Sequence, residues 1–101
     1  MAVARSYSFK SKVWLYDGKA AWHFITLPRD ESEEIRFLTS HSRTAWGSVR
    51  VHAKIGASGW ETSLFPDTKA GAYLLPVKAE VRRREKIGAG SVVAVKLDIK
   101  I

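Results

Sequence analysis

Apolar and polar residues alternate with a period of two through most of the chain, which is typical of β-strands that bury one face. The clearest example is residues 48–55, where the odd-numbered positions are apolar and Arg50, His52 and Lys54 lie between them. Residues 93–101 repeat the pattern. Their apolar positions are Val93, Val95, Leu97, Ile99 and Ile101. Both runs predict strands with one face in the core and the other toward water.

Four further runs predict strands. In the run nearest the N-terminus, the inward positions are Tyr7, Phe9, Val13 and Leu15, and the outward positions are Lys10 and Lys12. Residues 20–27, 60–65 and 73–77 are apolar more continuously. These three runs predict central strands, or strands that are covered on both sides.

Two segments have helical features. After Pro28, either Asp30 or Ser32 is placed to cap a helix, and the acidic residues nearby suit the positive end of the helix dipole. The buried stripe of this helix would consist of Ile35 and Leu38. A second, shorter helix is predicted over about residues 78–86, with Gly88 as its C-terminal cap.

The order of these elements is strand-strand-helix-strand-strand-strand-helix-strand. Asp17-Gly18 predicts a hairpin turn, and residues 56–59, with a glycine at each end, predict a short loop between two strands. This order cannot form a doubly wound sheet, so we expect a mainly β fold. It would be a small closed six-stranded barrel with two short helices, formed as a single domain over residues 1–101. The two helix-interrupted halves are loosely related in plan.

Five segments resemble the DUF1905 family, a family of small bacterial domains, in their order and spacing. They are residues 21–28 (Ala-Trp-His-Phe-Ile-Thr-Leu-Pro), 49–56 (Val-Arg-Val-His-Ala-Lys-Ile-Gly), 61–66 (Glu-Thr-Ser-Leu-Phe-Pro), 72–77 (Ala-Tyr-Leu-Leu-Pro-Val) and 86–95 (Lys-Ile-Gly-Ala-Gly-Ser-Val-Val-Ala-Val). The resemblance covers about residues 7–101. It implies a double-split β-barrel and a family whose biochemical role is undefined.

The same barrel plan is similar to that of antitoxin and transition-state-regulator DNA-binding domains. Those domains build the barrel from two chains, whereas the resemblance implies that this chain completes it alone. One position departs from the family pattern, which usually has an acid after the last glycine. Here Ser91 follows Gly90, and serine also suits a turn.

Charge gives the first indication of a partner. The chain has 101 residues and a formal net charge of +7, which favours contact with nucleic acid or another polyanion. It has no cysteine, which excludes disulfides and thiolate chemistry and fits a reduced cytoplasmic compartment. No apolar run approaches the roughly 20 residues of a membrane span, and the first residues lack the apolar core of a secretory signal.

Basic residues concentrate on the predicted second helix. They are Lys78, Arg82, Arg83, Arg84 and Lys86. At helical spacing several of them share a face, so they would form a positive ridge that contacts phosphates. Residues that would extend the ridge are Arg5, Lys10, Lys12, Arg43, Arg50 and Lys54. The alternative is a solvated helix on which Glu80 and Glu85 offset part of the charge.

No motif for catalysis or for a cofactor is present. The spacing of His23, His41 and His52 forms neither a metal site nor a histidine–carboxylate pair close in sequence. His52 is expected to be solvated or packed on an outward strand face. His23 is expected to be hydrogen-bonded within the barrel wall, with a general base as the alternative, and His41 closes the first helix. Ser63 lacks a nucleophile elbow, and Glu61 is the one isolated acid that would suit a pocket. We therefore expect no enzyme, metal or cofactor.

Four tryptophans are many for this length. Trp22 and Trp60 are expected to fill the barrel core. Trp14 follows the outward phase of its strand, and Trp46 lies in a loop. These two would either stack on bases or line a ligand groove, or they would pack beneath loops and helices.

Two classes of function remain. The first is a non-catalytic binding domain that contacts nucleic acid or another polyanion through the basic helix. The alternative is a small-molecule-binding or enzyme-accessory domain. Its cleft would be lined by Trp22, His23, Glu61 and Arg82. In either case we expect a monomer more than an obligate oligomer.

Overall fold

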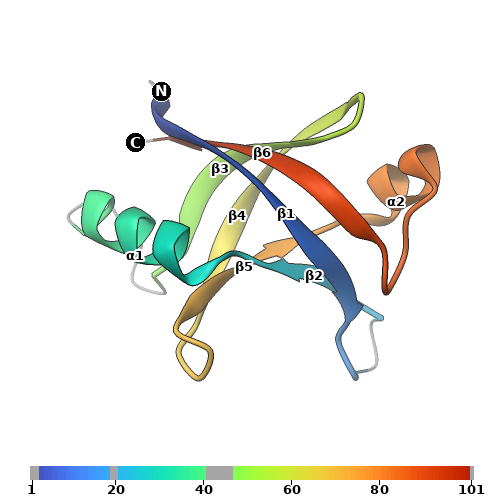
Figure 1. Ribbon diagram of the computed structural model, residues 1–101, viewed down its shortest axis with the longest axis horizontal. Helices are drawn as coiled ribbons and strands as arrows, with labels where there is room; N and C mark the ends of the chain where they lie inside the picture. The colour runs from blue at the N-terminus through green and yellow to red at the C-terminus, as the bar shows by residue number, and fades with distance from the viewer. Residues whose placement is uncertain (1–2, 19–20, 41–46, 101) are drawn as a thin grey trace.

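Six strands and two helices follow one another in the predicted order within the part of the chain that the computed structural model describes, residues 3–18, 21–40 and 47–100 (Figure 1). The elements are β1 (Val3–Leu15), β2 (His23–Thr26), α1 (Arg29–Leu38), β3 (Val49–Ile55), β4 (Ser58–Asp67), β5 (Ala72–Pro76), α2 (Ala79–Glu85) and β6 (Val92–Lys100). Among these described residues, no helix is long and apolar enough to cross a lipid bilayer. The prediction of a mainly β fold is confirmed.

The strands pair antiparallel around a closed barrel in the order β1-β2-β5-β4-β3-β6, so one chain completes the barrel (Figure 1). Two long strands each pair with different partners along their length. Residues 3–12 of β1 pair with β6 and residues 13–15 with β2, whereas β4 pairs first with β3 and then, over residues 65–67, with β5. The wall therefore divides into a front sheet, β1-β6-β3-β4, and a back sheet, β1-β2-β5-β4.

The two halves of the chain repeat one plan, as expected. The first half runs β1-β2-α1-β3 and the second runs β4-β5-α2-β6. Exchanging the halves turns every pair of neighbouring strands into a neighbouring pair of the same barrel, with β2-β5 and β3-β6 each mapped onto itself. The two helices lie at opposite ends of the molecule in Figure 1. A β-β-α-β unit cannot close a barrel alone, and two such units remove each other's free edges.

The core fills the barrel with the inward side chains that the alternation predicts. Those with no exposed surface are Val13, Ile25, Ile35, Val51, Ala53, Leu64, Leu75, Leu97 and Ile99. Trp60 is 5% exposed, which confirms its predicted place in the core. The alternation of buried and open positions is complete along β3 and nearly so along β6. Burial of these aliphatic side chains is the main source of stability for a domain of this size.

Two residues that the sequence predicts in the barrel core lie outside the core. Trp22 is 52% exposed and Leu15 is 50% exposed. The pairing of β1 with β2 ends at Leu15 and His23, so both side chains lie at the rim of the barrel, where no further strand covers them. For the same reason β2 is shorter than the predicted strand over residues 20–27.

The two other continuous apolar runs differ from each other. β5 is buried along nearly its whole length, as the sequence predicts for a strand covered on both sides. β4 instead buries Ser58, Trp60 and Leu64 and leaves the residues between them more open. Of the two alternatives, the central strand is the one that holds for β4, which pairs with both β3 and β5 and turns only one face to the barrel interior.

The helix ends differ from the prediction. α1 begins at Arg29, directly after Pro28, and neither Asp30 nor Ser32 caps it with its side chain. Ser32 is buried instead, and its Oγ accepts a hydrogen bond of 3.1 Å from the backbone N–H of Tyr73 on β5. The serine thus fixes the helix to the barrel wall, a use that competes with capping. His41, Arg43, Trp46 and Ile101 lie outside the described residues.

α2 ends at Lys86, which has a left-handed backbone with φ of 56°, and not at Gly88. Gly88 belongs to the following turn, where its N–H donates to Oγ of Ser91 over 3.1 Å. The carbonyl of Ser91 accepts a hydrogen bond from the N–H of Val13, which attaches the turn to β1. Ser91 therefore takes part in the turn although the family usually has an acid there.

Two candidate binding faces

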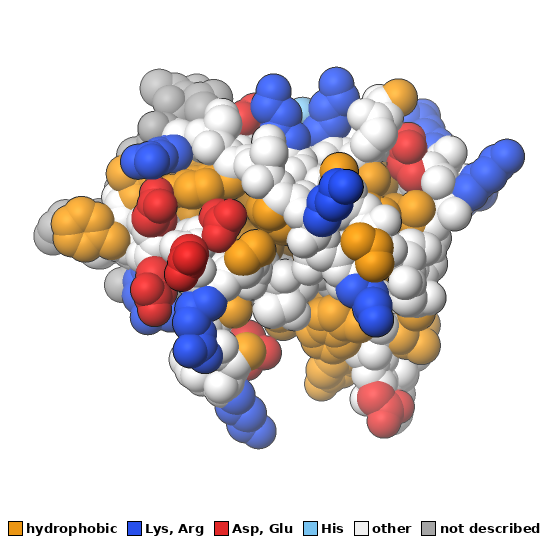
Figure 2. Space-filling model, in the orientation of Figure 1, with side chains coloured by type: hydrophobic (Ala, Val, Ile, Leu, Met, Phe, Trp, Pro, Cys, Tyr) orange, Lys and Arg blue, Asp and Glu red, His pale blue; other side chains and the backbone are white. Residues whose placement is uncertain are grey.

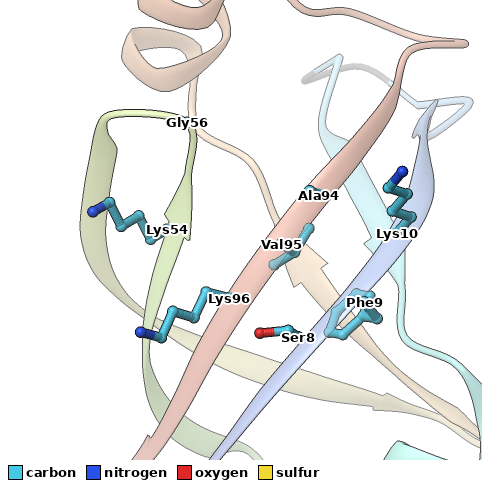
Figure 3. A pocket seen from close by; sticks show the side chains of 8 residues that line it. All are labelled: Ser8, Phe9, Lys10, Lys54, Gly56, Ala94, Val95 and Lys96. Atoms are coloured by element: carbon cyan, nitrogen blue, oxygen red, sulfur yellow. The ribbon is translucent and has the colours of Figure 1, made fainter.

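The first candidate site is a groove on the outer surface of the front sheet, with a volume of about 510 Å³ (Figure 3). Its lining residues are Ser8, Phe9, Lys10, Lys54, Gly56, Ala94, Val95 and Lys96. We call it the lysine groove. It is an open surface feature, with charged side chains at its sides and the backbone of β6 along its floor.

The register of the barrel places the three lysines. Lys54 of β3 lies directly opposite Lys96 of β6, and Lys10 of β1 lies opposite Ala94 of β6. Figure 3 shows Lys54 and Lys96 extending from neighbouring strands, with Lys10 on the other side of β6. Because Ala94 has only a methyl group, the surface is hollowed between the long side chains.

These lysines have no acidic partner. In residues 3–18, 21–40 and 47–100, no ion pair involves Lys10, Lys54 or Lys96. Like charges directly opposite each other on adjacent strands destabilise a sheet, by roughly 0.2–1 kcal/mol per pair. The groove therefore holds an uncompensated positive charge that an anion would neutralise.

Glu61, an acidic residue of the β3–β4 hairpin, has its own hydrogen-bond partners. Glu61 of β4 accepts a hydrogen bond of 2.7 Å from Nζ of Lys100 and another from Nδ1 of His52. The bond to Lys100, followed by the bond to His52, lowers the pKa of the Glu61 carboxyl below its ordinary value. This network joins β3, β4 and β6 on the outer surface and holds the Glu61 carboxylate on His52 and Lys100, not on the lysines of the groove.

The end of α2 lies against the hairpin that borders the groove. Oε2 of Glu85 accepts a hydrogen bond of 2.6 Å from the hydroxyl of Ser58. Its carboxylate also occupies the space that a Cβ atom at position 56 would need, and Gly56 has a φ of +59°. Glycine is therefore required there both for the two-residue turn and for the approach of the helix. This contact places the basic helix beside the lysine groove.

The predicted positive ridge on α2 forms only in part. Nε of Arg82 donates to the carbonyl oxygen of Val77 over 3.2 Å, and Arg84 pairs with Glu80 over 3.4 Å. The remaining basic residues of the ridge are exposed and have no ion pair among the described residues. They are Lys78, Arg83 and Lys86. The helix therefore contributes fewer free cations than its sequence suggests.

The second candidate site is a groove of about 570 Å³ on the back sheet, between the β1–β2 loop and the β4–β5 turn. Its lining residues are Trp14, Tyr16, Trp22, Phe24, Phe65, Pro66, Asp67, Thr68, Lys69 and Leu74. We call it the aromatic groove. Figure 2 shows hydrophobic side chains gathered at the lower edge of the molecule, beside a hollow between two protruding segments.

The aromatic rings of this groove support one another. Trp22 stacks on Phe24 with ring centroids 6.0 Å apart and planes 10° apart. Trp14 packs on Phe24 at 5.4 Å, and its Nε1–H donates to Oγ1 of Thr26 over 2.9 Å. Tyr16 meets Phe24 edge-on at 6.2 Å. The rings are thus held in place before any ligand is bound.

The cleft predicted from Trp22, His23, Glu61 and Arg82 is not assembled. Trp22 lines the aromatic groove, whereas Glu61 is engaged by His52 and Lys100 on the front sheet. The backbone carbonyl of His23 accepts a hydrogen bond from the N–H of Val77, and the carbonyl of Val77 accepts one from Arg82, so Arg82 lies near His23 while Glu61 lies on the other sheet. Nδ1 of His23 forms its hydrogen bond with the carbonyl oxygen of Ala21 over 3.0 Å.

In the described part of the chain, no three His, Cys, Asp or Glu side chains are grouped so as to hold a metal ion. The His52–Glu61 pair was missed because its residues are nine positions apart and become neighbours only across the β3–β4 hairpin. Lys96 lies at a polar position of the predicted strand over residues 93–101 and was missed as a site residue. Phe24, Phe65 and Leu74 were missed as a group because they come from three strands.

Comparison with known proteins assigns almost the whole chain to one family. The sequence profile of a family described as "Domain of unknown function (DUF1905)" matches residues 9–97. No curated protein matches the chain.

Proposed function

Since the chain belongs to the DUF1905 family, which has no assigned function, we propose its function from its own geometry. It is a non-catalytic domain that binds polyanions at the lysine groove, with nucleic acid as the most concrete partner. The basic residues of α2 that remain exposed would extend this surface. We propose that it acts as a monomer, since one chain closes the barrel.

The observation that carries the proposal is the pairing of Lys54 with Lys96 across β3 and β6, without a carboxylate partner. Alone, this arrangement costs stability. With a phosphate between the two ammonium groups, the repulsion becomes two attractive contacts. Lysines bind phosphate as point charges and do not read base sequence, so binding would be general for phosphate-bearing chains.

The alternative functions have less support. A small-molecule cleft built from Trp22, His23 and Glu61 would need all three together, and Glu61 lies apart from the other two, held by Lys100 and His52 on the front sheet. For an enzyme, the His52–Glu61 pair would be the natural acid–base pair. It lies on an open strand surface, bound to Lys100, and neither groove described above includes it. We therefore propose binding without catalysis.

The test is fluorescence polarisation of a labelled mixed-sequence DNA duplex at about 50 and 200 mM salt, where phosphate-driven binding falls steeply. The double variant Lys54→Gln/Lys96→Gln should bind about tenfold more weakly, and its plot of log affinity against log salt should be shallower by about two. The matched control is Arg29→Gln/Arg36→Gln in α1, which removes the same charge at the opposite end of the barrel.

Comparing the two variants separates binding at a defined site from attraction by net charge alone. If the lysine variant and the α1 variant lose affinity equally, only net charge is involved and the groove is not a site. Absence of binding at the lower salt concentration would reject the polyanion function altogether. A third variant, Arg83→Gln/Lys86→Gln, should weaken binding further if α2 extends the surface.

A further inference from the structure

We propose that the aromatic groove takes an unpaired base of a single-stranded nucleic acid whose phosphates lie along the lysine groove. The domain would then prefer single strands, of DNA or RNA, over duplexes. This inference rests on the proposed function and adds to it the kind of nucleic acid that is bound.

The aromatic groove is exposed where a folded protein ordinarily hides such residues. Tyr16 and Trp22 are about half exposed, and Phe65 is 44% exposed. All three line one hollow together with Trp14 and Phe24. Clustered exposed aromatic side chains around a concave site mark a place for a ligand, whereas single exposed apolar residues are ordinary.

The geometry of the rings suits a flat ligand. The near-parallel stack of Trp22 on Phe24 shows that the groove already orders one pair of rings face to face. Trp14 is fixed by its hydrogen bond to Thr26, so it cannot turn away. A nucleobase is planar and every base has a π-face, which is why aromatic platforms bind single strands of any sequence.

Strand β1 connects the two grooves. Its outward positions beyond Ser8 are Lys10, Lys12, Trp14 and, just past its end, Tyr16. At ~3.3 Å per residue, Trp14 lies ~13 Å along the strand from Lys10. A few nucleotides of extended single strand would therefore place phosphates on the lysines and a base in the aromatic groove. A single continuous surface thus holds the positive charge and the stacking platform.

A duplex cannot use both parts of this surface. Its bases are paired and stacked inside, so their faces cannot stack on the aromatic rings of the protein. In a single strand the bases can turn outward and stack on side chains. The aromatic groove would therefore add affinity for single strands alone, at about tenfold for one stacked base.

The experiment compares three labelled probes by fluorescence polarisation at about 50 and 200 mM salt. They are a 12-nucleotide oligothymidylate, an abasic 12-mer with the same phosphates, and a 12-base-pair duplex. The oligothymidylate should bind about tenfold more tightly than the abasic strand. The variant Trp22→Ala should remove this ratio while leaving the affinity for the abasic strand unchanged.

The control variant is Leu15→Ala, which removes an equally exposed apolar side chain that does not line the groove. It should keep the tenfold ratio, and Phe65→Ala, at the other side of the groove, should reduce it. Because all three side chains lie outside the core, the variants should fold, which circular dichroism checks.

Failure of this inference differs from failure of the proposed function. If the oligothymidylate and the abasic strand bind equally well and both weaken with salt, the lysine groove binds phosphates and the aromatic groove takes no base. The same conclusion follows if Trp22→Ala leaves the ratio intact. If none of the probes binds, the polyanion function itself is rejected, and the inference with it.

Discussion

The front and back sheets of this barrel share one interior and differ completely on their outer surfaces. Outward positions of the front sheet carry Lys10, Lys54 and Lys96 and a network of hydrogen-bonded polar groups around Glu61. Outward positions of the back sheet carry the rings of the aromatic groove. Figure 2 shows basic side chains along the upper edge of the molecule and hydrophobic ones at its lower edge.

This difference shows that folding constrains which side chains point inward and leaves the identity of the outward ones free to vary. Inward residues of both sheets are aliphatic or aromatic because they fill the same core. Outward residues need only tolerate water, so a neutral, mixed surface would suffice. The front sheet instead carries lysines that face each other and repel. The back sheet exposes clustered aromatic rings to water. Both arrangements cost free energy. A bound ligand is the simplest compensation for each.

The largest effects should come from breaking the interior that the two faces share, at Leu97 or at Trp60. Leu97 of β6 has no exposed surface, and Leu97→Ala should reduce the free energy of unfolding by about 3 kcal/mol through lost burial and a cavity. Urea denaturation measures this. Val92→Ala, on the exposed phase of the same strand, should change stability by less than about 0.5 kcal/mol. Equal losses for the two would mean that the strand is not in the assigned phase.

The second effect distinguishes Trp60 from Trp22, both of which the sequence predicts in the core. Trp60→Ala should cost about 3–5 kcal/mol because the ring fills the core, whereas Trp22→Ala should cost about 1 kcal/mol for its stack on Phe24. Thermal melts of both variants test this. A loss at Trp22 as large as that at Trp60 would show that the back face is structural and not a binding surface.

A smaller effect, of opposite sign, is expected on the front face. Lys96→Gln removes the like-charge pair with Lys54, so it should raise the free energy of unfolding by about 0.5 kcal/mol at low salt. The gain should shrink as salt rises, because screening already weakens the repulsion. Lys78→Gln, outside the groove, should give no such gain. Destabilisation by Lys96→Gln would contradict the idea that the groove retains its charge at a cost.

The smallest effect concerns pH. The hydrogen bonds from Lys100 and His52 lower the pKa of Glu61 below its ordinary value of 4.5, so the ionised carboxylate stabilises the folded state. This contribution is present above pH 4.5 and is lost as the pH falls through the lowered folded-state pKa. Wild-type protein should therefore lose more stability between pH 5 and 3 than Glu61→Gln does. Parallel thermal melts across this range compare the two proteins, and identical pH profiles would show that the network contributes nothing.

Much of the fold followed from local rules. The period-two alternation placed β3 and β6 and their buried positions, and Gly56 marked the turn between β3 and β4. The predictions that were wrong lie at the ends of elements. Ser32 was expected to cap α1 and instead bonds β5, and Lys86 ends α2 where Gly88 was expected. Element ends depend on tertiary contacts that compete with local capping, so sequence alone does not decide them.

The sites were less predictable than the fold, for a physical reason. The sequence by itself determined the inward and outward phases, the order of strands and helices and the excess of positive charge, because these depend on local pattern and on composition. Only the tertiary structure decided that Lys54 faces Lys96, that His52 and Glu61 meet, and that Trp22 joins Phe65 at the rim and not in the core. Each of these depends on the register between strands and on where pairing ends. Register and closure arise from the packing of the whole barrel, which is why they appear only when its strands are brought together.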